Sequence, residues 1–332
     1  MYFDVAMPVT LFTFTLVAIF LERKVEKKLK STFEERELGL KEAVVLVASI
    51  CIMVSLIVLI PGTFVMMIYL FSYSMLLFIF TYLFSDMRRF WARSFLWTFL
   101  ASSFLAATLS VLSYRTDESV AYGGLALYVL SASAFIGLLC EELRTDRSER
   151  WYLAVLPPAL FVSLYLFFSR TPFWFPYLLD LFGGLFAVLI VLYLGSLFRW
   201  KSTLAFVGLL TVVDVILVLY TGSMVSAARH VSGLLLPISV SLPTVPSVLT
   251  EWGVLYMSLG LGDFFFAGLI CTQSAKRFGR WFGLWSAAAM SLSFFVFEVL
   301  MLNLVVEAFP GTLMIVSGWL PLLWGQLKKR KA

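Results

Sequence analysis

Residues that hold metal ions or form disulfides are scarce in this sequence. Its 332 residues include three cysteines and one histidine. Cys51, Cys140 and Cys271 each lie inside an apolar run, and none has the Cys-x-x-Cys spacing of a zinc site. We therefore interpret them as structural thiols, and we expect the protein to need no metal ion and no other cofactor.

Charged residues are also scarce. They make up 14% of the chain, whereas hydrophobic residues make up 61%, and the mean hydropathy is +0.96. This composition excludes an ordinary soluble domain. The sequence predicts a multi-pass integral membrane protein surrounded by the lipid bilayer, in the cell membrane if the source is prokaryotic.

Long apolar runs bounded by charge, proline or glycine predict the membrane spans. Only Pro61-Gly62 separates the second run from the third, and the last run is short, so we expect nine to eleven spans in an all-α, polytopic transmembrane helix bundle. The first run has its basic residues after it, which indicates a retained span and not a signal peptide. The eleven runs cover about residues 4–21, 43–61, 64–84, 95–113, 120–140, 152–169, 177–198, 202–222, 251–273, 282–306 and 309–326.

Basic residues predict the orientation, because short cytoplasmic loops are rich in Lys and Arg. With the N-terminus outside, 22 of the 25 basic residues fall in inside segments, whereas Arg115, Arg170 and Arg229 fall outside. The bias predicts an outside N-terminus, a cytoplasmic C-terminus and an odd number of spans. The net charge of +5 then reflects topology, and we expect no nucleic-acid partner.

Two aspartates interrupt apolar runs near their middle. Asp214 lies in the run 202–222 and Asp263 in the run 251–273, each about 18 Å from its start at about 1.5 Å per residue. An acid at that depth costs at least about 2.5 kcal/mol on insertion scales and indicates a functional site. If the two helices are antiparallel neighbours, the carboxylates meet and share one proton. One could then activate water as a base while the protonated one polarises a peptide carbonyl.

The residues around both acids resemble a known family. Gly260-Leu261-Gly262-Asp263 has the form Gly-x-Gly-Asp, and the segment from Asp214 to Val225 carries Asp-Val, then Val, Thr and Met-Val at the offsets of signal peptide peptidases. Pro310-Gly311-Thr312-Leu313 begins 47 residues after Asp263, where the family has a Pro-Ala-Leu motif. Over about residues 200–322 the chain resembles the presenilin and signal peptide peptidase family of intramembrane aspartyl proteases.

The resemblance implies hydrolysis of peptide bonds within transmembrane segments or signal peptides, with Asp214 and Asp263 as the catalytic pair. It divides the chain into N-terminal helices, 1–199 with about seven spans, and a catalytic half, 200–332. The predicted orientation is similar to that of signal peptide peptidase and implies substrates with their N-termini inside. The resemblance also implies substrate contacts for Gly260, Leu261, Gly262, Pro310, Gly311, Thr312 and Leu313.

The chain departs from the family in three places. Val213 stands where a tyrosine is usual, and Gly311-Thr312 replaces Ala-Leu, which leaves activity and the shape of the substrate side open. Seven predicted spans precede residue 200, where the family usually has five. We expect either two added helices or one miscounted hairpin.

Other functions remain open. Buried acids also occur in proton- or cation-coupled transporters, although those usually contain an internal repeat, which this sequence lacks. The chain could also be an inactive relative of the protease. Prepilin peptidases share Gly-x-Gly-Asp, but they usually have fewer spans and act at the cytoplasmic boundary. The sequence identifies neither the substrate nor the oligomeric state.

Three further polar residues and one connector call for an interpretation. We expect Asp180 to be hydrated at the outer end of its span, and His230 to be solvated. For Glu298, in mid-span, we favour a structural or pore-facing hydrogen bond over a third catalytic acid. The connector from Ser223 to Thr250 is either a lid on the membrane surface beside the acidic helices or a plain linker. We expect the glycines before Asp263 to let another backbone approach.

Overall fold

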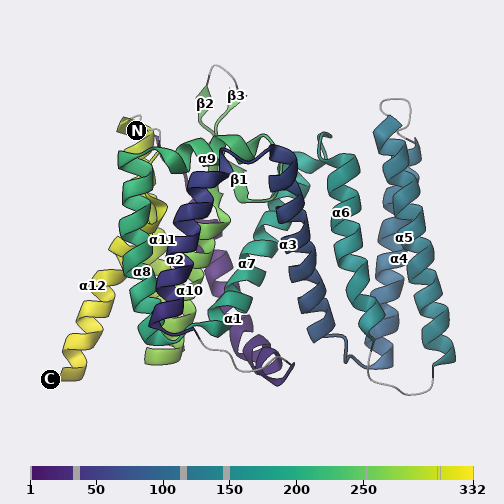
Figure 1. The fold of residues 1–332 in the computed structure, drawn as a ribbon, viewed down its shortest axis with the longest axis horizontal. Coiled ribbons are helices and arrows are strands. Elements are labelled where there is room, and N and C mark those ends of the chain that lie inside the picture. Colours follow the sequence, from purple (N-terminus) through teal and green to yellow (C-terminus); the bar gives the residue numbers. More distant parts are fainter. Residues whose placement is uncertain are drawn as a thin grey trace. The chain divides into compact units, whose positions relative to one another are not determined.

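A computed structural model describes residues 2–32, 38–112, 118–144, 150–250, 253–304, 306 and 308–331. Twelve α-helices lie within these ranges (Figure 1). Nine helical segments of the described chain are long and apolar enough to cross a membrane. The protein is therefore a predominantly helical, multi-pass membrane protein, and this number agrees with the predicted nine to eleven spans.

Each predicted run corresponds to a helix in whole or in part. Pro61 separates α2 from α3, as predicted. The helices α10 and α12 are not among the nine candidate spans. The α-helices are α1 Ala6–Thr32, α2 Leu40–Ile57, α3 Gly62–Leu83, α4 Arg89–Leu112, α5 Glu118–Leu143, α6 Leu156–Phe168, α7 Leu179–Leu197, α8 Trp200–Val215, α9 Ser223–Ser232, α10 Leu261–Phe278, α11 Arg280–Leu304 and α12 Gly311–Lys331. Short 3-10 or π segments adjoin three of them: η1 Trp151–Val155, η2 Trp174–Leu178 and η3 Ile216–Tyr220.

The chain forms two compact units. Unit 1 contains Met1–Gly62 and Leu179–Ala332, and unit 2 contains Thr63–Leu178. The boundary predicted at residue 200 does not coincide with either junction, because α1, α2 and α7 pack with the C-terminal helices. Both aspartates of the predicted pair lie in unit 1.

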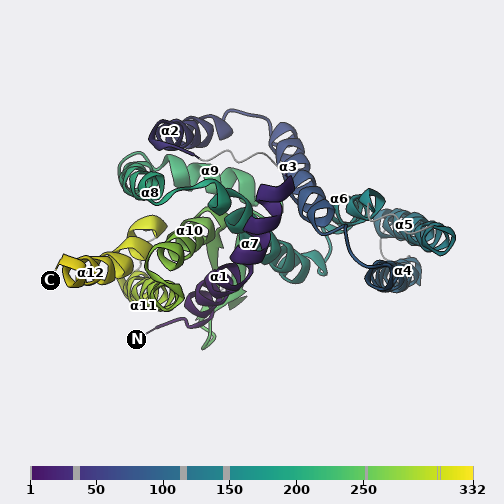
Figure 2. The same ribbon diagram turned by 90° about the horizontal axis from the view of Figure 1, so that it is seen from below.

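Helix α10 is the centre of unit 1. It contacts α1, α7, α8, α11 and α12, which surround it when the helices are seen end-on (Figure 2). Small residues allow this close packing: a Cβ on Gly268 would lie 2.5 Å from Val191 of α7. At its end, the Gln273 side chain donates hydrogen bonds to the carbonyls of Gly195 and Phe198, 3.0 and 2.9 Å away. The helix that carries Asp263 is thus held on all sides.

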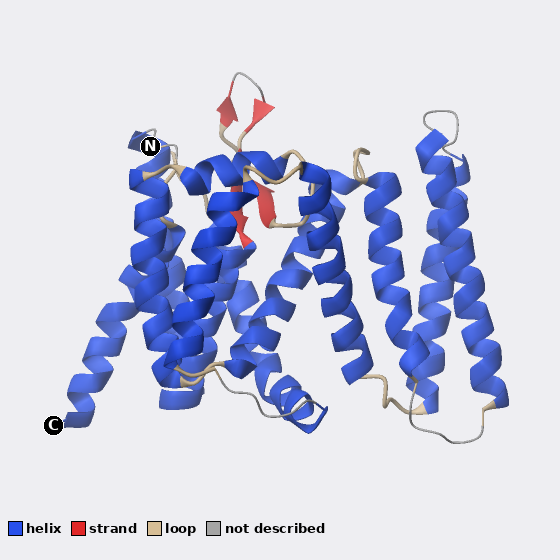
Figure 3. Ribbon diagram, viewed as in Figure 1, coloured by secondary structure: helices blue, strands red, loops and turns tan. Residues whose placement is uncertain are grey.

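Two small antiparallel sheets interrupt the helical fold (Figure 3). Strand β1, Ser239–Pro243, pairs with β4, Tyr256–Gly260, and strand β2, Leu249–Thr250, pairs with β3, Gly253–Val254. The prediction of one helix over 251–273 is therefore wrong before Leu261. A short apolar run is compatible with either a buried strand or a helix. Here the residues before Leu261 form a strand because they pair with β1.

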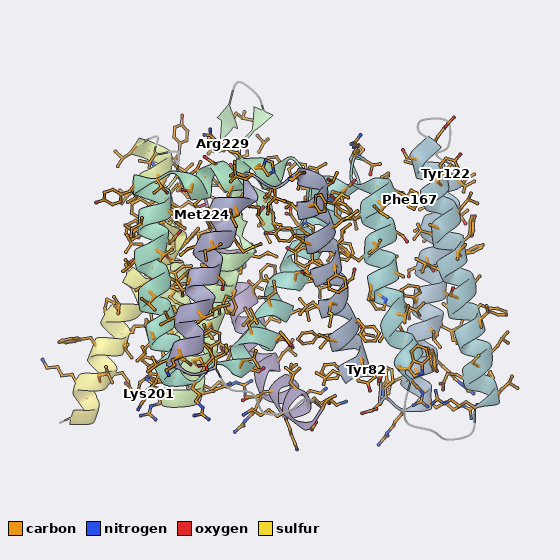
Figure 4. The ribbon with its side chains drawn as sticks, viewed as in Figure 1. Tyr82, Tyr122, Phe167, Lys201, Met224 and Arg229 are labelled. Carbon is orange, nitrogen blue, oxygen red and sulfur yellow. The ribbon has the colours of Figure 1, made fainter. Side chains whose placement is uncertain are left out.

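Unit 2 packs α4, α5 and α6 around a core that includes Leu96, Leu127 and Leu153. At one end, the buried Glu141 carboxylate accepts hydrogen bonds from Arg150, at 3.1 Å, and from the Tyr152 hydroxyl. The exposed Tyr82 and Tyr122 lie at opposite ends of this unit (Figure 4). Tyrosines at both ends are typical of the aromatic belts of membrane proteins.

Two basic residues of unit 1 that were predicted on opposite sides of the membrane lie at opposite ends of the unit. Lys201, predicted inside, and Arg229, predicted outside, lie at opposite ends of the unit (Figure 4). Three other residues of the charge count, Arg36, Arg115 and Arg147, and the start of the run at Glu251 lie outside the described residues.

Candidate active site

Asp214 lies near the end of α8, where the helix widens into the π-helix η3. The π-helical hydrogen bond runs from the Thr221 N–H to the Ile216 carbonyl, at 3.0 Å. The Asp214 side chain is buried, at 8% exposure. Its Oδ2 accepts two hydrogen bonds from Thr312, one from the backbone N–H at 3.2 Å and one from Oγ1 at 2.6 Å.

Asp263 lies in the first turn of α10, which corrects the prediction that it lies about 18 Å from the start of its helix. Its helix begins at Leu261 because β4 occupies the residues before it. The Leu261 N–H donates to the Ile238 carbonyl at 2.9 Å, which fixes the junction between strand and helix. A carboxylate in a first turn also faces the positive end of the helix dipole.

The start of α12 brings the two aspartates together. Thr312 bonds Asp214, and a Cβ on the preceding Gly311 would lie 2.5 Å from Asp263 Oδ1 and 2.7 Å from its Cγ. The missing side chain at Gly311 therefore lets the Asp263 carboxylate lie against the α12 backbone. The two acids are close enough for their charges to interact.

The opposite ends of the same helices also meet. The Trp200 ring, at the start of α8, lies 5.2 Å from the Phe278 ring, at the end of α10. The end of α8 and the start of α10 meet at Gly311 and Thr312. Helices α8 and α10 are therefore antiparallel neighbours, which is the condition that the sequence analysis set for the two acids to meet, and the acids lie at the same end of the pair.

The other residues predicted for substrate contacts line the same junctions. Gly260 ends β4, and Leu261 is buried. The Pro310 carbonyl accepts hydrogen bonds from the N–H groups of Leu313 and Met314, both at 3.2 Å, and so completes the first turn of α12. Thr312, also predicted to contact the substrate, donates two hydrogen bonds to Asp214.

The expected close approach of another backbone is found at Gly260, which pairs with Ser239 of β1, but not at Gly262. A Cβ on Gly262 would meet no atom of the described chain within 4 Å. A Cβ on Gly260 would lie 3.6 Å from Asp263 Oδ2 and 4.0 Å from Gly262 N, both within the same junction. Open space therefore lies beside the residue that precedes Asp263.

Two carboxylates that the sequence analysis did not connect to the site hold the β1 segment in place. Asp180, in the first turn of α7, accepts a hydrogen bond from the Ser241 N–H at 2.7 Å. It is half-buried and bonded, so the expectation of a merely hydrated side chain is wrong. Asp4 is fully buried and accepts the N–H of Val245 at 2.7 Å and that of Ala6 at 3.0 Å. No local pattern could have predicted contacts across 61 and 241 residues.

Glu298 and His230 also differ from expectation. Glu298 is 1% exposed, and neither carboxylate oxygen has a hydrogen-bond partner among the described residues. The described residues therefore provide no structural hydrogen bond for this carboxylate. His230 is half-buried, and its buried Nε2 has no partner among the described residues, so it is not fully solvated.

No family model, curated protein or solved structure matches this chain. The interpretation of the site therefore depends on its geometry and on the local motifs. Within the described residues, no three side chains of His, Cys, Asp or Glu are grouped so that they could hold a metal ion. What the geometry provides is a carboxylate pair beside a strand end and a glycine-lined space.

Proposed function

We propose that this protein is an intramembrane aspartic endopeptidase, with a core of the presenilin and signal peptide peptidase type. The observation that carries the proposal is the contact of both Asp214 and Asp263 with consecutive residues, Gly311 and Thr312, at the start of α12. Three separate sequence motifs thus meet at one point. A purely structural role for the acids gives no reason for that convergence.

The chemistry needs one proton on the pair. Two donors from Thr312 stabilise Asp214 as a carboxylate, so Asp214 is suited to take a proton from the attacking water. Asp263, which receives no such pair of bonds, is suited to hold the proton and pass it to the carbonyl oxygen of the peptide bond. The water oxygen bonds to the carbonyl carbon, and collapse of the tetrahedral intermediate with protonation of the nitrogen breaks the C–N bond.

Strand β4 provides a way to present an extended substrate. In the described sheet, β4 is hydrogen-bonded to β1 alone, and Asp180 already takes the Ser241 N–H on the outer side of β1. A substrate strand therefore adds to the free edge of β4, which leads directly to Gly260, Gly262 and Asp263. The substrate class is a transmembrane segment or signal peptide that unwinds before cleavage, because helical hydrogen bonds enclose the carbonyl.

A proton- or cation-coupled transporter is the second candidate, and one observation favours it. Glu298 and Asp4 are further acids buried in unit 1, and intramembrane acids are common along proton pathways. An inactive relative of the protease remains a third reading. In the protease peptide cleavage depends on Asp263, in the transporter ion flux depends on it, and in the inactive relative neither does.

Purified protein in proteoliposomes distinguishes these functions. A fluorescent transmembrane peptide with its N-terminus on the cytoplasmic side should be cleaved by the wild type and not by Asp263→Asn. A pH-sensitive dye in the same vesicles measures flux. Flux that requires Asp263, without peptide cleavage, would overturn the protease assignment in favour of a transporter.

A further inference from the structure

A charged cavity lies in unit 1 between the end of α1 and the junction of α10 with α11, far along α10 from the aspartates. Its volume is about 920 Å³, and its lining includes Ile19, Phe20, Arg23, Lys27, Lys276 and Arg280. This size is within the range of pockets that hold small organic molecules. Neither the aspartate pair nor the β1 segment contributes to it.

The cavity spans the point in α1 at which the sequence changes from apolar to charged. Helix α1 has no charged residue from Ala6 to Leu21, whereas seven of the nine residues from Glu22 to Lys30 are charged. The cavity lining includes Ile19 and Phe20 on the apolar side of this change, and Arg23 and Lys27 on the charged side. The phosphates of membrane lipids lie at this level.

The two acidic side chains of the cavity are balanced by two lysines. Lys276 forms ion pairs with Glu22 at 2.9 Å and with Glu26 at 3.0 Å, and Lys30 pairs with Glu26 at 3.2 Å. Arg23 and Lys27 form no ion pair with any acidic side chain in the described chain, and both are exposed. The unpaired charge in the cavity is therefore positive.

Phe20, from the apolar part of the cavity lining, contacts Arg280, from the charged part. The Arg280 guanidinium lies over the Phe20 ring, 4.3 Å from its centroid, a cation–π contact that holds the guanidinium plane in place. Its N–H groups can still donate in that plane, in the fork that matches phosphate oxygens. Phe20, Arg23 and Lys27 are spaced i, i+3 and i+7, so they share one face of α1.

We propose that this cavity binds one anionic phospholipid. Arg23, Lys27 and Arg280 hold the headgroup phosphates, and an acyl chain follows Ile19 and Phe20 into the bilayer. Two phosphate sources share this chemistry, a lipid headgroup and free phosphate, and the apolar wall favours the lipid. The proposal is independent of the proteolytic function.

Native mass spectrometry of the full chain, released from nanodiscs of equal phosphatidylglycerol and phosphatidylcholine, tests this site. The wild type should retain one phosphatidylglycerol in clear excess over phosphatidylcholine. The variant Arg23→Gln/Lys27→Gln/Arg280→Gln should lose this excess, by roughly fivefold for each basic residue removed near the membrane surface. The matched control Lys41→Gln/Lys201→Gln/Lys329→Gln removes three exposed charges that were also predicted inside, and it should keep the excess.

Two further measurements keep the proposal falsifiable even if the triple variant is unstable. Retained phosphatidylglycerol on the wild type should fall as NaCl rises from 0.05 to about 0.5 M, because the contact is ionic. In nanodiscs of phosphatidylcholine alone, added inorganic phosphate should not raise the thermal midpoint. No lipid preference in the wild type, equal loss in the control, or stabilisation by phosphate alone would each overturn the proposal.

Discussion

Thr312 donates two hydrogen bonds to a single carboxylate oxygen of Asp214, from its backbone N–H and from Oγ1. Hydrogen bonds to an ionised group are about twice as strong as neutral ones. The side chain and the backbone of one residue thus fix the position of the Asp214 carboxyl group. Thr312 is a positioning residue of the proposed site, whereas the sequence motif alone placed it against the substrate.

Replacing Thr312 with valine should reduce kcat about 10- to 100-fold, because it removes one bond to a charged group worth about 1.5–3 kcal/mol. Thr312→Ser keeps the hydroxyl and should restore most of the activity. The control Thr211→Val removes a hydroxyl of α8 that bonds only within its own helix. The pH profile of peptide cleavage measures the effect, and a profile that stays unchanged in Thr312→Val would rule out this role.

Gly311→Ala should lower the cleavage rate about 100-fold while the protein still folds. The new Cβ would lie 2.5 Å from Asp263 Oδ1, so the carboxylate must move, and a displacement of about 1 Å costs about 100-fold in rate. Gly325→Ala is the matched control, because its Cβ meets no described atom within 4 Å. Cleavage rates and thermal midpoints should be compared for both variants. Equal activity in the two would show that Gly311 does not set the position of Asp263.

The two aspartates should behave as one unit. Asp214→Ala and Asp263→Ala should each lower kcat at least about 1,000-fold, and the double variant should be no worse, because residues that act together are non-additive. Loss of a buried charge should leave thermal stability equal or higher. Glu298→Gln changes another buried acid of unit 1 and should keep cleavage. Substantial proteolysis by either single variant would contradict the shared-proton mechanism.

Pro310→Leu should reduce cleavage and leave folding largely intact. Proline has no N–H and fixes its own backbone before α12, and its carbonyl begins the hydrogen bonding of the first turn. A leucine there allows the helix to extend backward over the substrate side. Cleavage of a transmembrane peptide and circular dichroism measure the two effects. Unchanged cleavage would show that Pro310 only sets the start of α12 and does not shape the substrate side of the site.

Reporter fusions should place the C-terminus and the connector 223–250 on opposite sides of the membrane. The reason is the distribution of basic residues, 22 to 3. A phosphatase that is active only outside should report activity from the connector, and a cytoplasmic fluorescent reporter should fluoresce after Lys331. The same side for both fusions would refute the predicted topology.

The existence of most of the helices was predictable, because long apolar runs indicate candidate membrane spans. The antiparallel pairing of α8 with α10 was set only as a condition for the two acids to meet, and the structure fulfils it. Strand β4 did not follow from the sequence, because the apolar run that contains Tyr256–Gly260 is compatible with either a helix or a strand. The contacts of Asp180 and Gly311 are tertiary and leave no local pattern.

The ring contacts at the far end of α8 affect how far Asp214 moves when the helix tilts. Trp200 packs against Phe278 and against Trp319, with centroids 5.2 and 6.2 Å apart, which joins α8, α10 and α12 at that end. Asp214 lies fourteen residues from Trp200, about 21 Å along the helix. If α8 tilts about this aromatic contact, a tilt of about 5° moves the Asp214 carboxyl group by about 2 Å. A tilt that opens the pair would have to break the two hydrogen bonds from Thr312 to Asp214, whereas the ring contacts at the other end of the helix could stay in place.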